Sequence, residues 1–274
     1  MGRIDIHLHL QNEKGLMEVS STVMEMMPHL EELGIDHGVL MSISKDWNEH
    51  NLKSVQKYPE KYSWMCHVEL DDDIEGQILR HKANGAVGVG EITHNLWIEN
   101  EKIQQLFAAA EKHNMPVLFH MSGEEGFSYG ICDKPGLTML EESLKKFPNL
   151  KFIGHSQTFW AEMDGNVTED ERGGYPKGKI EEEGAIAKLM RKYPNLYGDV
   201  SAGSGWNALA RDEEYAVKFI NEFQDRLMFG TDICRPDTAT PLVDFMLKLR
   251  DEKKISETVF QKVARENIIR ILDL

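Results

Sequence analysis

Short apolar runs alternate with longer amphipathic stretches along the whole chain. The runs are rich in β-branched and aromatic residues and predict eight strands, at residues 4–10, 38–43, 62–68, 86–91, 116–120, 151–155, 196–200 and 227–231. Between them, apolar residues recur at helical spacing and predict helices at residues 20–33, 74–84, 101–113, 138–147, 180–193, 212–223, 241–250 and 257–274. Ser20 is the expected N-cap of the first helix. Strands that alternate with helices indicate parallel pairing through right-handed crossovers.

The number of these units suits one closed barrel. The chain has 274 residues, and about 250 residues are typical of a (β/α)₈ barrel. No linker or change of composition divides it. We therefore predict an α/β fold with one domain over residues 1–274, a (β/α)₈ TIM barrel with a long loop after the sixth strand and an extra C-terminal helix. An open, doubly wound sheet is the alternative. The long loop, residues 156–179, has the length of a binding loop.

Groups that can bind a metal or transfer a proton stand at the ends of the predicted strands. His7 and His9 are two residues apart on the first strand, so their imidazoles point to the same side, as a shared metal ion requires. Four other apolar strands end on Glu91, His120, His155 and Asp232. In a barrel these ends form one rim, where active sites lie. In an open sheet they would lie in a row and could not converge, which favours the barrel.

Charge and composition exclude several classes of function. The formal net charge of −15 opposes binding to nucleic acid or to anionic lipid. No apolar run approaches 18 residues, so no membrane span is expected. Cys66, Cys132 and Cys234 lie far apart without a CxxC pair, and the first residues carry charges where a signal peptide is apolar. These features predict a cytoplasmic protein.

At the strand ends the chain resembles the amidohydrolase superfamily of metal-dependent (β/α)₈ barrels. Its later part is similar to the family 2 branch, which includes aminocarboxymuconate-semialdehyde decarboxylase and related lactone hydrolases. The resemblance covers nearly the whole chain and is carried by Asp5-x-His7-x-His9, Glu91, His120, His155, Gly230-Thr231-Asp232, the stretches 193–201 and 226–232, and Ala264-Arg265-Glu266-Asn267.

The resemblance implies a metal site. His7, His9, His120 and Asp232 would bind a divalent cation, with His155 nearby for the substrate or a second metal ion. The decarboxylase-like branch does not generally need a glutamate at the position of Glu91. If Glu91 is a metal ligand, the site could hold either one or two metal ions. Zinc is the first expectation and manganese the alternative. The cation would lower the pKa of a bound water molecule. By the same resemblance, Asp232 would accept its proton, while His155 would polarise a carbonyl group.

The function that follows is a metal-dependent hydrolase for an ester, lactone or amide bond of a small, carboxylated metabolite. Guanidinium groups bind carboxylates in a fork, which favours Arg172 and Arg235 as substrate ligands. Three other residues after strand ends are expected to contact the substrate: His94, Trp160 and Tyr175. A metal-dependent decarboxylase on the same site is the first alternative. A TatD-type deoxyribonuclease is the second, favoured by Glu91 and opposed by the net charge, and a non-catalytic binding barrel is the third. The resemblance also allows a homo-oligomer.

Overall fold

The structure is a computed structural model that describes residues 2–10, 21–126 and 128–274. Its strands are β1 (Arg3–Leu8), β2 (Ile35–Leu40), β3 (Tyr62–Trp64), β4 (Val89–Ile92), β5 (Val117–Ser122), β6 (Ile131–Cys132), β7 (Phe152–His155), β8 (Leu196–Asp199) and β9 (Leu227–Met228). The short β6 pairs with the end of β5, and its Cys132 also bridges to Trp97. This strand was not predicted. The other strands correspond one to one to the eight predicted strands, with ends that differ by a few residues.

The eight strands form a parallel barrel. One sheet has the order β1-β2-β3 and the other has the order β4-β5-β7-β8-β9, and every pairing is parallel. Single parallel bridges join the two sheets at both seams, Cys66 with Val89 and Leu8 with Ile233. The backbone N–H of Ile6 also donates to the carbonyl of Phe229 across the second seam, at 3.0 Å. The predicted barrel is confirmed, and the open sheet is not.

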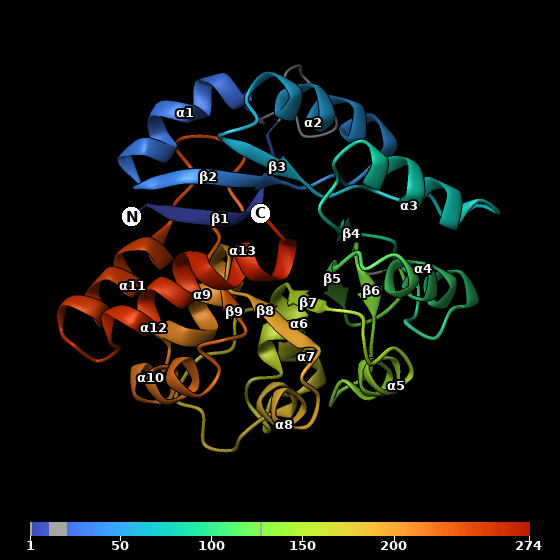
Figure 1. Cartoon of the computed structure of the whole chain (residues 1–274). Helices are drawn as coiled ribbons and strands as arrows, with labels where there is room; N and C mark the ends of the chain where they lie inside the picture. The colour runs from blue at the N-terminus through green and yellow to red at the C-terminus, as the bar shows by residue number, and fades with distance from the viewer. Residues whose placement is uncertain (1, 11–20, 127) are drawn as a thin grey trace.

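Helices surround the strands, as Figure 1 shows. They are α1 (Val23–Glu32), α2 (Lys45–Lys57), α3 (Ile74–Ala83), α4 (Glu101–Lys112), α5 (Thr138–Lys146), α6 (Gln157–Ala161), α7 (Glu169–Arg172), α8 (Ala185–Lys192), α9 (Ala202–Ala210), α10 (Glu213–Glu222), α11 (Pro241–Asp251), α12 (Glu257–Gln261) and α13 (Asn267–Leu272), with a π-helical turn at Lys262–Glu266. Thr22 caps α1, whereas the predicted cap Ser20 lies outside the described residues. The connection after β7 was predicted as a loop but contains α6 and α7.

The sequence analysis did not predict the helices α2 and α9. The helix α2 buries Trp47, Asn48, Asn51 and Ser54, so its inner face is mostly polar and lacks the apolar periodicity that predicts a helix. The helix α9 contains two glycines, which disfavour helical structure. A side chain at Gly205 would lie only 2.3 Å from the carbonyl oxygen of Val200, so close packing requires the glycine there.

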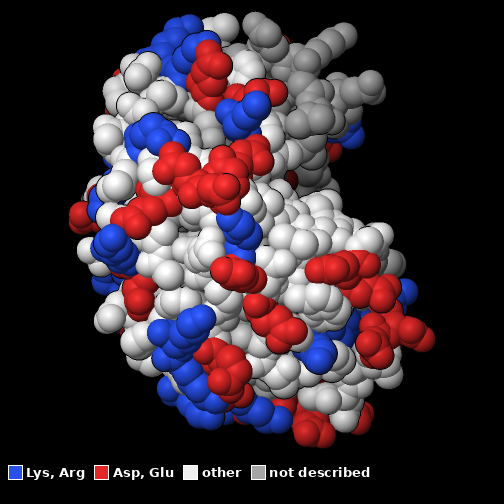
Figure 2. All heavy atoms as spheres, turned by 90° about the vertical axis from the view of Figure 1, so that its right-hand side faces the viewer, with Lys and Arg blue, Asp and Glu red and all other residues white. Residues whose placement is uncertain are grey.

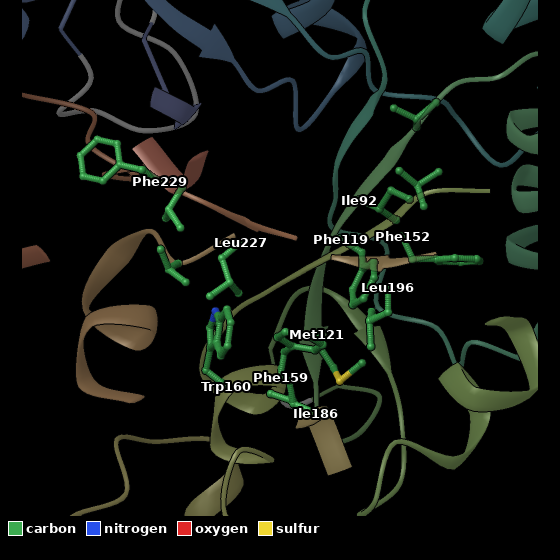
Figure 3. Packing of buried hydrophobic residues seen from close by; sticks show 14 of the residues in the cluster. Ile92, Phe119, Met121, Phe152, Phe159, Trp160, Ile186, Leu196, Leu227 and Phe229 are labelled. Carbon is green, nitrogen blue, oxygen red and sulfur yellow. The ribbon is translucent and has the colours of Figure 1, made fainter. Parts of the chain in front are cut away.

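The hydrophobic core has two parts. An outer cluster fills the space between strands and helices, and Figure 3 shows part of it around Phe119, Phe152, Phe159, Trp160 and Leu227. An inner cluster fills the barrel with side chains such as Ile4, Ile6, Met65, Leu118 and Met228. Three residues of α13 also belong to this inner cluster: Ile268, Ile271 and Leu272. The extra C-terminal helix therefore packs onto the inside of the barrel and contributes to its core.

No helix in the described part of the chain is long and apolar enough to cross a membrane.

Candidate metal centre

Four side-chain atoms from three parts of the chain converge at the barrel rim. The Nε2 atoms of His7 and His9 lie 3.0 Å apart. Asp232 Oδ1 lies 3.5 Å from His7 Nε2 and 3.4 Å from His9 Nε2. Glu91 Oε2 lies 3.8 Å and 3.4 Å from the same two nitrogens. We call these four residues the ligand quartet.

The spacing within the ligand quartet fits a metal ion. Ligands at about 2.1 Å from a tetrahedral ion lie about 3.4 Å from one another, close to the distances found here. Most of these separations are too long for good hydrogen bonds. Two imidazoles and two carboxylates are also a donor set that zinc and manganese accept. The residues present therefore fit a divalent cation. Two possible ligand groups share His7: one adds His9 and Asp232, and the other adds Glu91 and His155.

The backbone around β1 explains how the two histidines reach the same point. The register of β1 against β2 is irregular between Asp5 and Leu8, and such irregularities re-aim side chains next to active sites. Asp5 is fully buried and accepts hydrogen bonds from the backbone N–H groups of His7, at 2.9 Å, and Thr231, at 3.0 Å. The N–H of Asp232 donates to the carbonyl of His7 at 2.9 Å. These contacts hold both ligand-bearing segments together.

Asp199, at the end of β8, is a residue of this site that the sequence analysis did not single out. Its carboxylate is fully buried, and Oδ2 lies 2.7 Å from His7 Nδ1 and 3.1 Å from His155 Nδ1. It also accepts a hydrogen bond from the hydroxyl of Ser201 at 2.9 Å. An acceptor at Nδ1 fixes the His7 tautomer so that the Nε2 lone pair faces the ligand quartet. The signal was present, because the apolar run of β8 ends on this acid as other strands end on His155 or Asp232.

Charges in the site compensate one another. Burial alone would raise the pKa of the Asp199 carboxyl, but His155 and His7 outweigh it and hold this pKa well below its usual value. The pKa of Glu91 is likewise lowered, because its contact with His120 outweighs its burial. Burial would lower the pKa of His155, but Asp199 and Asp232 raise it well above the usual value. The site therefore holds its carboxylates in the charged form, which is the form that binds a metal. The same carboxylates also raise the pKa values of His7 and His155, so a metal ion would have to displace a proton to bind either imidazole.

His155 and His120 lie beside the ligand quartet in different roles. His155 Nε2 is 3.6 Å from Asp232 Oδ2, and His155 also shares a possible ligand group with His7 and Glu91. His120 Nδ1 lies 2.8 Å from Glu91 Oε1, and its ring contacts that of Tyr129. Neither of the two ligand groups around His7 contains His120. The role of His120 as a metal ligand stays a prediction. In the structure His120 contacts the carboxylate of Glu91.

Two residues predicted to contact the substrate lie in the protein interior instead. Trp160 belongs to α6, is buried in the outer cluster, and donates through Nε1 to the carbonyl of Asp199 at 2.8 Å. Arg172, in α7, is 1% exposed. Its Nε lies 2.5 Å from Glu162 Oε1, and its other nitrogens donate to the carbonyls of Asp133 and Lys134. Both polar groups are used inside the protein, so neither residue is open to a substrate in this structure.

The other three predicted substrate residues are more accessible. Tyr175 is 48% exposed, and its hydroxyl lies 3.3 Å from Gln157 Nε2. Arg235 follows β9 on the same segment as Asp232 and pairs with the exposed Asp237 at 2.7 Å. His94 follows β4 and stacks on His67, with ring centroids 4.9 Å apart. As substrate contacts, these three residues stay predictions.

Comparisons with known proteins agree with this architecture. No curated protein matches the chain significantly. An uncharacterised TIM-barrel protein from Bordetella bronchiseptica superposes with a TM-score of 0.69 at 16% identity, over 100% of this chain and 99% of that one. A probable 2-pyrone-4,6-dicarboxylic acid hydrolase from Acinetobacter baumannii, with citric acid bound, gives 0.63 at 15% identity over 100% of both chains. A 5-carboxyvanillate decarboxylase mutant from Novosphingobium aromaticivorans, with manganese bound, gives 0.67 at 16% identity over 99% and 97%.

At such identities these structures are evidence for the fold alone. The sequence itself is informative about the family, since the family model described as Amidohydrolase matches residues 4–274, which include the whole ligand quartet. The resemblance first read from the strand ends is thereby confirmed, and the chain belongs to the amidohydrolase family.

Proposed function

We propose that this protein is a metal-dependent hydrolase that cleaves an ester, lactone or amide bond of a small, carboxylated metabolite. The observation that carries the proposal is the ligand quartet, whose nitrogen and oxygen atoms lie 3.0 to 3.8 Å apart in the pairs given above. His7, His9, Glu91 and Asp232 would hold one divalent cation, zinc or manganese. His155 would take part if a second ion binds.

The cation would supply Lewis acidity and lower the pKa of a water molecule toward neutrality. Asp232 would act as the proton acceptor. Its side chain is 26% exposed, whereas those of His7, His9 and Glu91 are 7% exposed or less, so water reaches this ligand most easily. His155 would polarise the substrate carbonyl, with its ring held by Asp199 at Nδ1.

Decarboxylation is supported equally by the comparisons, because the similar structures include 2,6-dihydroxybenzoate and 5-carboxyvanillate decarboxylases as well as the 2-pyrone-4,6-dicarboxylic acid hydrolase. Both reactions take carboxylated substrates, and the same ligands could serve either. Arg235, on the segment that carries Asp232, is the arginine we propose for the substrate carboxylate.

A panel of substrates decides between the two reactions. The protein, loaded with zinc or with manganese, is incubated with carboxylated lactones, carboxylated esters and amides, and hydroxybenzoates. We expect ring opening of a lactone, seen as proton release and loss of ultraviolet absorbance, without carbon dioxide. Release of carbon dioxide from a hydroxybenzoate would instead show that the protein is a decarboxylase and would contradict the proposed hydrolase. Chelated protein serves as the control, and turnover that persists after chelation would contradict the metal dependence of either reaction.

Removing the metal is expected to destabilise the fold. A ligand that binds only the native state adds about 4 kcal/mol at a thousand times its dissociation constant, so a chelator should lower the thermal midpoint by several degrees. Added zinc or manganese should restore it. The variant His9→Gln, which lacks one ligand, should show a smaller response. Identical melting curves with and without chelator, for protein in which elemental analysis finds no metal, would contradict the metal centre.

The remaining expectations are proposals of the same kind. The barrel strands and the C-terminal helix share the inner cluster, which supports a single domain over residues 1–274. Figure 2 shows basic and acidic side chains interspersed over the described part of one face, a distribution that gives nucleic acid no continuous basic band. A small-molecule substrate, a cytoplasmic location and a homo-oligomer stay predictions.

A further inference from the structure

A second cluster of potential ligands lies outside the ligand quartet, at the ends of β3 and β4. It consists of His67, Glu69 and His94, whose ligand atoms all lie within 4.8 Å of one another. The two imidazoles are nearly parallel, with an interplanar angle of 19°. Both strand ends belong to the same barrel rim as Glu91. His94 is also one of the residues predicted to contact the substrate. None of the three side chains belongs to the ligand quartet, which does not explain their arrangement.

The imidazoles of this cluster have unused polar atoms. The His67 side chain is 93% buried, since its exposed fraction is 7%. Among the described residues, Nδ1 of His67 and Nδ1 of His94 are both buried and have no hydrogen-bond partner. Leaving a buried polar atom without a partner costs about 1 to 3 kcal/mol. An ion bound at Nδ1 would remove this cost, whereas Nε2 is the His67 atom that lies next to Glu69.

The backbone at the cluster is held from two helices. Asn48 of α2 is buried, and its side chain accepts the N–H of His67 at 2.7 Å and donates to its carbonyl at 2.8 Å. Gln77 of α3 makes the same pair of bonds with Glu69, at 2.9 and 3.0 Å. Buried amides thus hold the backbone of two of the three residues in place. Residues that carry a binding site are best held on such fixed backbone.

The chemistry of the three side chains suits a cation. Two imidazoles and one carboxylate are groups that bind a transition-metal ion. Glu69 supplies a carboxylate that is 49% exposed. His67 Nε2 and Glu69 Oε1 are 3.5 Å apart, which is long for a hydrogen bond but close to the distance of about 3.4 Å between two ligands of one tetrahedral ion.

We propose that His67, Glu69 and His94 form a second binding site for a divalent transition-metal ion, with zinc as the best match. Two imidazoles and one carboxylate are three protein ligands, so at least one coordination position stays open. Glu69 is 49% exposed, so solvent reaches this member of the cluster. This site does not depend on the proposed hydrolase reaction, because its ligands are separate from the ligand quartet.

Zinc binding to matched variants tests the site. The full chain is equilibrated with zinc chloride, dialysed, and analysed for zinc per chain. We expect His94→Gln to hold one equivalent less than the wild type, and to need at least about tenfold more zinc to fill what remains of the site. His113→Gln, a histidine paired with the surface residue Glu75, is the control and should hold as much zinc as the wild type.

A second set of variants separates this site from the catalytic centre. Glu69→Gln changes a half-exposed side chain and carries the test if His94→Gln does not fold. His9→Gln removes a ligand of the quartet and should still lose one further equivalent when it is combined with His94→Gln. Equal zinc contents in the wild type, His94→Gln and Glu69→Gln would overturn the proposal, and so would saturation of this equivalent only at millimolar zinc. Neither outcome would bear on the hydrolase function.

Discussion

Asp232→Asn is expected to lower kcat/KM at least about a thousandfold, equivalent to about 4 kcal/mol of transition-state stabilisation. The carboxylate lies between the metal ligands and His155, and an amide can neither take up the proton nor replace the negative charge. Asp232 has a left-handed backbone with φ of 58°, which asparagine also tolerates well. The variant should therefore fold normally, and steady-state kinetics with circular dichroism would show both effects.

The matched control is Asp237→Asn, which removes the same charge five residues later. Asp237 is 73% exposed and contacts Arg235 rather than the ligand quartet. The kcat/KM of Asp237→Asn should stay within a few-fold of the wild-type value. If Asp232→Asn kept activity within tenfold of the wild type while binding its full complement of metal, Asp232 would not be the proton acceptor.

Arg172→Met is expected to lower the free energy of unfolding by about 3 kcal/mol. The side chains of Arg172 and Glu162 are 2% and 5% exposed, so the variant leaves a buried carboxylate without its partner. It also removes hydrogen bonds to two backbone carbonyls. Urea denaturation would measure the loss. KM should change little, because the structure places the guanidinium inside the protein.

Two further variants make this result specific. Arg235→Met removes a half-exposed arginine with one surface ion pair and should cost less than about 1 kcal/mol. Adding Glu162→Gln to Arg172→Met removes the unpaired charge and should recover part of the lost stability. A stable Arg172→Met protein with a strongly raised KM would instead support the prediction from the sequence that this arginine binds the substrate.

Predictions based on local patterns were the most successful. The Nε2 atoms of His7 and His9 lie 3.0 Å apart, as the two-residue period of a strand predicts, although β1 is irregular after Asp5 and ends at Leu8. Glu91, His155 and Asp232 come together with them because strand ends share a rim in every such barrel. The order of these residues along the chain and their positions at strand ends were sufficient to predict that their side chains lie close together at the rim.

Other features depended on contacts that no local pattern reveals. The helix α2 is stabilised by burying polar residues such as Asn48 and Asn51, which bond to backbone and side-chain groups of other segments. The sequence predicts that Arg172 binds a substrate carboxylate, but in the structure this arginine is paired with the buried Glu162. Asp199 was overlooked because the strand was expected to end one residue later, on Val200.

The sequence by itself determined the number and order of the eight barrel strands, the family, and the set of side chains that could meet at the rim. Periodicity and strand ends are local properties, so they can be read along the chain. Only the tertiary structure decided which atoms share one point, which arginine is buried against a carboxylate, and which histidines are buried. Distances and burial between residues far apart in sequence set those outcomes, because hydrogen bonding, ion pairing and desolvation act between neighbours in space.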